Sequence, residues 1–215
     1  MKKLLIVLIL IVPFRLAFSQ EEPNSSEYKT LLGNVDHFGA FNGLCFKVGP
    51  VHEEVGLMMG GNMAFIFNHR FMLGVAGYGL TTRSDFRGVD FAGLDTSLTV
   101  GMGYGGLLLK YNFFPTSPIH FSVPVLVGAG GSTVKYRDAE WYTNFEDNLY
   151  KPMTVENTSY LVVEPGLNVE LNLTRWARFS IGVSYRYIYG SSLKNLSDAQ
   201  LSDYAVNANL KLGYF

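Results

Sequence analysis

The chain has 215 residues, of which 48% are hydrophobic, 14% are aromatic and 23 are glycine, and its formal net charge is −1. The near balance of 17 Lys and Arg against 18 Asp and Glu argues against nucleic-acid binding. A single cysteine, Cys45, excludes an intrachain disulfide, and we interpret it as a small strand residue rather than a reactive thiol.

The first segment has the features of an export signal. Two lysines precede an apolar core from Leu4 to Val12, and the small residues Ala17 and Ser19 stand three and one positions before a cleavage site. This core is about half the length that a membrane-spanning helix needs. We therefore expect a signal peptide at residues 1–19, a flexible periplasmic segment at 20–36, and one folded domain at 37–215.

The mature chain contains eight alternating or apolar runs, and we predict that they are strands joined in sequence order. In chain order the runs are Phe38–Val48, Val55–Phe67, Phe71–Thr81, Ser97–Phe113, Ile119–Tyr136, Tyr160–Leu173, Ala177–Tyr189 and Tyr204–Phe215.

Tight turns alternate with longer polar connections along these runs. The tight turns are residues 68–70, 114–118 and 174–176, and the other connections are 49–54, 83–96, 137–159 and 190–203. Short turns at one rim and long loops at the other are typical of barrels in the bacterial outer membrane, where the turns face the periplasm. An even number of strands also places both ends of the barrel at the periplasmic rim.

Charged residues alternate with apolar ones in the later strands. In the run Tyr160–Leu173, Glu164 and Glu170 share one face with asparagines, while leucines and valines occupy the other. A carboxylate facing lipid is costly, so the polar face must line the lumen. We expect Glu170 to lie near Arg178 and Glu164 to lie within diagonal reach of Arg186. The predicted lumen charge network comprises Lys47, Lys110, Glu164, Glu170, Arg178, Arg186 and Lys211.

Aromatic residues gather near the tight-turn ends of the strands, as an interfacial girdle should. The predicted girdle comprises Phe71, Phe113, Phe121, Trp176, Phe179 and Tyr214. In the last strand, Leu210, Leu212 and Tyr214 are in phase with one another, whereas Phe215 is out of phase. We therefore expect Tyr214 to face lipid.

The signal peptide, eight strands, alternating connections and aromatic ending together resemble the small OmpA/OmpX-like eight-stranded outer-membrane barrels of Gram-negative bacteria. The resemblance implies an all-β, eight-stranded antiparallel up-and-down transmembrane β-barrel with short periplasmic turns and longer extracellular loops. It also implies contact with outer-membrane lipid and lipopolysaccharide, and insertion by the barrel-assembly machinery, which recognises a last strand such as Leu210–Phe215. A protein partner in the outer membrane is a further candidate.

Only weak patterns indicate chemistry. His120 and Ser122 share one strand face, a spacing that resembles the His-x-Ser of lipid A deacylases, but they lie at the periplasmic end, whereas those enzymes act on the outer leaflet. His52, Glu53 and Glu54 are adjacent loop residues, a weak pattern for a metal site. We assign no catalytic residue, no cofactor and no metal.

The long loop at 137–159 carries Trp141, Tyr142, Phe145 and Tyr150 among acidic residues. These rings either form a recognition surface or fold over the barrel mouth as a plug. Eight strands enclose only enough room for side chains, which argues against a general diffusion pore. We expect a non-enzymatic outer-membrane barrel with a structural, accessory or interaction role. The alternatives are a lipid-modifying enzyme, a narrow ion channel and a secreted ligand-binding barrel.

Overall fold

The computed structural model describes residues 35–52, 54–89, 93–137 and 154–215. The predicted signal peptide, most of the segment 20–36 and the loop aromatics Trp141, Tyr142, Phe145 and Tyr150 lie outside these ranges. In chain order the described elements are β1 (Phe38–Val51), β2 (Glu54–Phe67), β3 (Phe71–Leu80), β4 (Ser84–Val89), β5 (Asp95–Phe113), β6 (Ile119–Tyr136), β7 (Thr154–Asn172), β8 (Ala177–Tyr189), α2 (Asp198–Leu201) and β9 (Asp203–Tyr214).

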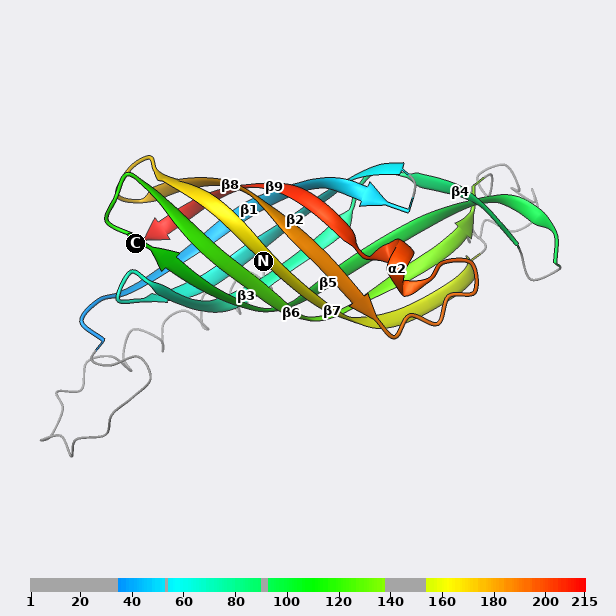
Figure 1. The fold of residues 1–215 in the computed structure, drawn as a ribbon, viewed down its shortest axis with the longest axis horizontal. Helices are drawn as coiled ribbons and strands as arrows, with labels where there is room; N and C mark the ends of the chain where they lie inside the picture. The colour runs from blue at the N-terminus through cyan, green and yellow to red at the C-terminus, as the bar shows by residue number, and fades with distance from the viewer. Residues whose placement is uncertain (1–34, 53, 90–92, 138–153) are drawn as a thin grey trace, which may run out of the picture. The chain divides into compact units, whose positions relative to one another are not determined.

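The strands form one antiparallel sheet that closes on itself (Figure 1). The hydrogen-bonded order is β3-β2-β1-β9-β8-β7-β6-β5-β4, and the pairing of β3 with β5 closes the barrel. β3 pairs with the inner part of β5 and β4 with its outer part, so β3 and β4 occupy one position in the wall. The wall therefore has eight strand positions, which confirms the predicted eight-stranded antiparallel barrel.

The two rims of the barrel differ. We call the rim with the tight turns at 68–70, 114–118 and 173–176 the turn end, and the opposite rim the loop end. β1 begins and β9 finishes at the turn end, because Ala40 pairs with Tyr214. Asn68 and His69 adopt left-handed backbone angles of 50° and 60° in φ, a conformation that Asn and His tolerate better than most residues.

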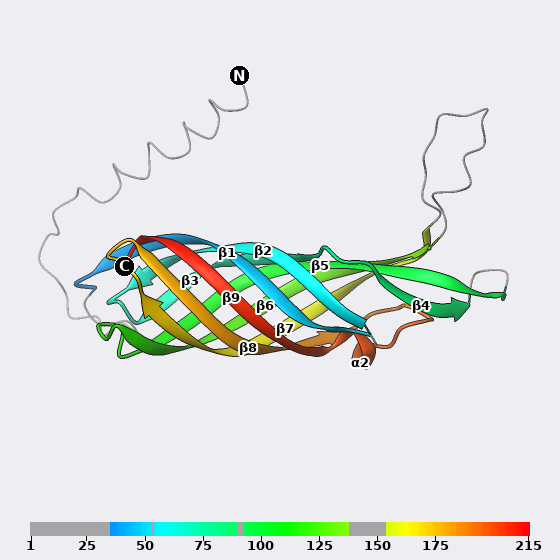
Figure 2. The same cartoon turned by 90° about the horizontal axis from the view of Figure 1, so that it is seen from above.

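Three strands project beyond the rest of the barrel at the loop end (Figure 2). β5, β6 and β7 have 19, 18 and 19 residues, against 10 to 14 for β1, β2, β3, β8 and β9. Together with β4 they form a ribbon, which we call the extension. The prediction that residues 83–96 and 137–159 form loops is therefore wrong in part, because Ser84–Val89 and residues 154–159 belong to strands. Phe86 is the one large apolar side chain before Val89 in β4, so the alternation there is too weak to recognise.

The outer wall of the barrel is apolar. Strands β2, β3, β5 and β6 place Met63, Val75, Leu107 and Val127 opposite one another in register, and each side chain is exposed. The inward positions are buried and include all seven predicted lumen charges. This arrangement is inside-out relative to a water-soluble barrel, because the apolar side chains face outward and the charges are enclosed.

Among the described residues, no helix is both long and apolar enough to cross a membrane.

Candidate functional site

The turn-end half of the lumen is organised around the carboxylate of Glu170 on β7. Its Oε1 atom accepts hydrogen bonds from Lys110 on β5, from Lys211 on β9 at 2.9 Å and from Ser122 on β6 at 2.6 Å. Both lysines and the glutamate are at most 3% exposed. Because an isolated buried charge is very costly, this shared contact is what allows the three charged groups to be enclosed.

A second ion pair lies farther along the lumen. Lys47 on β1 contacts Glu164 on β7, and the hydroxyl of Tyr104 on β5 donates to the other oxygen of Glu164 at 2.5 Å. The Lys47 ammonium also lies 3.4 Å from the centroid of the Tyr78 ring, as a cation–π contact. The Lys47 ammonium also donates to the Tyr104 hydroxyl at 3.4 Å, so three side chains hold it.

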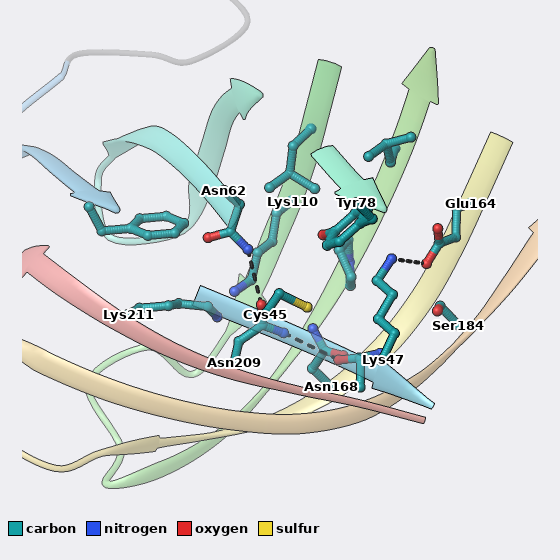
Figure 3. Close-up of a pocket in the computed structure, with 15 residues that line it drawn as sticks. Cys45, Lys47, Asn62, Tyr78, Lys110, Glu164, Asn168, Ser184, Asn209 and Lys211 are labelled. Carbon is teal, nitrogen blue, oxygen red and sulfur yellow. Dashed lines mark hydrogen bonds and ion pairs between the residues drawn. The ribbon is translucent and has the colours of Figure 1, made fainter. Parts of the chain in front are cut away.

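Between the two ion pairs lies a small polar cavity of about 40 Å³. Figure 3 shows Lys47 reaching toward Glu164 on one side of Cys45, with Lys110, Lys211 and Asn209 on the other. A water molecule needs roughly 10–15 Å³ measured in this way, so the cavity holds only a few waters. The lumen is therefore filled by its own side chains.

The glutamates expected near the two buried arginines form their ion pairs with lysines. Glu170 does interact electrostatically with Arg178, as the predicted proximity requires. The guanidinium of Arg178 also packs 4.1 Å from the centroid of the Phe215 ring, at the turn end. Arg186 donates to the carbonyl oxygen of Leu201 at 3.0 Å.

The two aromatic residues at the end of the chain face opposite sides of the wall. Tyr214 is 67% exposed on the outer wall, as expected, and the Phe215 ring turns inward to stack on Phe41 at 5.9 Å. Phe215 thus covers Arg178 and Phe41 at the turn end. Consecutive residues of a strand point to opposite faces, so the two adjacent aromatics lie on opposite sides of the wall.

The loop-end half of the lumen is apolar and is closed by the chain between β8 and β9. Leu196 and Leu201 are at most 1% exposed and pack into a cluster with Leu98, Val134 and Ile188. We call residues 190–202 the plug. The sequence predicts only a polar connection here, because two leucines among Ser, Asn and Asp do not signal burial.

The plug also covers the free edge of the extension. The side chain of Asn195 accepts a hydrogen bond from the backbone N–H of Val89 at 2.8 Å and donates to the carbonyl of Val89 at 2.9 Å. Asn195 further donates to Glu156 on β7 at 2.8 Å. The Asn195 amide thus forms the two hydrogen bonds that the backbone of a neighbouring strand would form with Val89. These bonds protect the edge of β4, which would otherwise be unpaired there.

The predicted girdle residues lie near the turn end. The outward side chains of Phe113, Phe121, Trp176 and Tyr214 are 44% to 67% exposed. Phe71 and Phe179 are half-buried on the same wall. Phe113 pairs in register with Phe121, so the aromatic positions of neighbouring strands lie at similar heights.

The weak patterns for chemistry are not supported by the geometry. Ser122 donates to Glu170 rather than to His120, whose Nε2 lies 3.7 Å from the other oxygen of Glu170, so the described contacts form no Ser–His pair. Glu54 accepts the backbone N–H of Asp85, and Glu53 lies outside the described residues. In the part of the chain that the structure describes, no three His, Cys, Asp or Glu residues form a cluster suited to a metal.

No protein-family model and no curated protein matches the sequence. Solved structures do match. Neisserial surface protein A (NspA) aligns with a TM-score of 0.50 and 12% identity, covering 81% of this chain and 96% of its own. The fold is that of the small eight-stranded outer-membrane barrels.

Two further structures align less closely. The outer membrane protein OprG from Pseudomonas aeruginosa has a TM-score of 0.42 and 13% identity, covering 86% of this chain and 97% of its own. The attachment invasion locus protein Ail of Yersinia pestis has a TM-score of 0.39 and 16% identity, covering 82% and 96%. The apolar outer wall independently requires a membrane around such a fold, and the chain is an integral, multi-pass outer-membrane β-barrel.

Proposed function

We propose that this barrel acts through the surface at its loop end, as an accessory or interaction protein, and not by passing solutes through its lumen. The observation that carries the proposal is the closed lumen. The cavity between the ion pairs has about 40 Å³, and the plug buries Leu196 and Leu201 in the loop-end mouth. A small solute would have to displace both the ion pairs and the apolar cluster.

The extension supplies the surface for such a role. Its strands lengthen the wall by five or more residues beyond the neighbouring strands, and β4 and the plug are joined through Asn195. Val89 at the end of β4 and Leu94 just before β5 have 50% and 64% of their surfaces exposed. Exposed apolar residues next to paired strands are suited to contact a protein partner.

The proposed contacts with membrane lipid and with the barrel-assembly machinery use other surfaces of the same barrel. The outward leucines, valines and aromatics give the wall its contact with outer-membrane lipid and lipopolysaccharide. The exposed, in-phase Leu210, Leu212 and Tyr214 of β9 are available to the barrel-assembly machinery during insertion.

Site-specific photo-crosslinking in intact cells tests the proposed role. A photoreactive residue at position 94 should give a discrete adduct with a protein, whereas the same residue at position 173, exposed at the turn end, should not give that adduct. Absence of any adduct from position 94, or the same adduct from both positions, would contradict a role for the extension.

A further inference from the structure

Two buried lysines share one acceptor atom in the lumen. The ammonium groups of Lys110 and Lys211 both donate to Oε1 of Glu170, so the two positive charges lie within a few ångströms of each other. At such separations in a low-dielectric interior, repulsion between like charges is strong. One glutamate cannot neutralise both lysines.

The charges around the cavity do not balance. Lys47, Lys110 and Lys211 line it, and the carboxylates in contact with them are Glu164 and Glu170, so the set carries three positive and two negative charges. Among the described residues, Glu164 is the one acidic side chain that lines the cavity. Arg178 and Arg186 are further buried positive charges in the lumen.

The lining offers hydrogen-bond donors as well as charge. An ammonium group has three N–H bonds, and among the described contacts Lys110 and Lys211 each direct one of them to Glu170. Asn62, Asn207 and Asn209 also line the cavity, where Asn62 donates one amide N–H to Asn209 and Asn209 donates one to Asn207. The cavity, with a volume of about 40 Å³, holds only a few water-sized groups, so it admits a small ion but not a bulky organic anion.

We propose that the lumen binds one small monovalent anion of the size of chloride, held by the ammonium groups of Lys110 and Lys211. The bound anion balances the single surplus charge of the five-residue set and receives the donors that Glu170 leaves unused. This inference does not depend on the function proposed for the extension.

Refolding in bromide tests the site directly. The full mature barrel is refolded in detergent with sodium bromide, crystallised, and examined by anomalous scattering at the bromine edge. A bromide peak in the cavity, within hydrogen-bonding distance of Lys110 and Lys211, is the expected result. A well-ordered lumen that contains only water would overturn the proposal, since one lysine would then have to be neutral.

Stability in two salts tests the same site in solution. At equal ionic strength, chloride should lower the unfolding equilibrium constant relative to gluconate, by roughly tenfold when chloride exceeds its dissociation constant tenfold. Lys211→Met removes the surplus charge and should abolish the difference, whereas Lys135→Met, which changes a lysine outside the lumen set, should retain it.

An equal effect of chloride on wild type and Lys211→Met would show a general salt effect and overturn the proposal. If Lys211→Met fails to fold, Lys110→Met replaces it in the two-salt comparison. This variant also removes one of the two ammonium groups that meet at Glu170. The bromide experiment uses the wild-type barrel, so it tests for a bound anion even if neither variant folds.

Discussion

At the turn end of the lumen, Glu170 and Glu164 are buried against lysines, whereas at the loop end Leu98, Val134 and Leu201 are buried against one another. Side chains fill most of the lumen in both halves, but by different means. In the polar half, each lysine depends on one glutamate of another strand, so the loss of that glutamate leaves a buried charge without its partner. In the apolar half, the stabilising contacts are spread over many side chains, and the loss of one is partly absorbed by the others.

The largest expected loss of stability comes from removing the Glu170 carboxylate in the polar half. Glu170→Gln keeps the shape of the side chain but leaves Lys110 and Lys211 without their carboxylate, and we expect it to lower the free energy of unfolding by about 3–5 kcal/mol. Urea unfolding of the refolded barrel measures this. Asp95→Asn is the matched control, because Asp95 pairs with Arg87 at the surface and its loss should cost at most about 0.5 kcal/mol. If both variants lost similar amounts of unfolding free energy, the claim that the buried ion pair contributes more to stability than the exposed one would be refuted.

The next effect comes from opening the apolar half. Leu201→Ala removes a side chain that is 0% exposed, and we expect a loss of about 2–3 kcal/mol. The backbone of the plug should also become more accessible to protease, while the electrophoretic mobility of the folded barrel stays unchanged. An unchanged digestion rate at the plug would indicate that Leu201 does not hold it in the mouth.

A smaller effect is expected where the plug meets the edge of the extension. Asn195→Ala removes the side-chain hydrogen bonds to Val89 and Glu156, which should cost about 1 kcal/mol. Hydrogen exchange at the amide of Val89 should become faster, while amides in the middle of β7 should exchange as before. Equal exchange at Val89 in the variant and the wild type would rule out this edge protection.

The smallest effect concerns the turn end, outside the membrane-spanning part. His69 stacks on His37 with ring centroids 3.6 Å apart, and burial, followed by the charges of His37 and Arg178, lowers the pKa of His69 from its ordinary value of 6.5. The folded state therefore disfavours protonated His69. The free energy of unfolding should be highest above about pH 6.5 and should decrease as the pH falls below this value.

The slope of stability against pH in this range should diminish in His69→Asn, since Asn accepts the left-handed backbone angle at this position. A slope that is unchanged in the variant would assign the pH dependence to other groups.

Much of the barrel could be predicted from the sequence, because a strand in a membrane wall must alternate and its alternation is local. The positions of Glu164 and Glu170 on the inward face followed from this rule alone. Their partners did not, since Lys47 and Glu164 are 117 residues apart and lie on β1 and β7, which are not adjacent in the sheet. Such contacts depend on how the barrel closes and on the register of every pairing between the two strands.

The plug and the extension were missed for a different reason. Leu196 and Leu201 stand alone among polar residues, and Ser84–Val89 mixes polar and apolar residues without a clear period. Their burial and pairing come from docking on β5, β7 and β8, which local patterns do not encode. The sequence showed that Phe215 is out of phase with the outward residues, but it did not show that the ring packs on Arg178.

Single-channel recording in planar lipid bilayers tests the central claim, that the lumen is closed along both halves, most directly. The refolded wild-type barrel should give no conductance steps in potassium chloride. Discrete steps that scale with salt concentration and change in amplitude in Glu170→Gln would show that ions pass the ion pairs and would contradict the account.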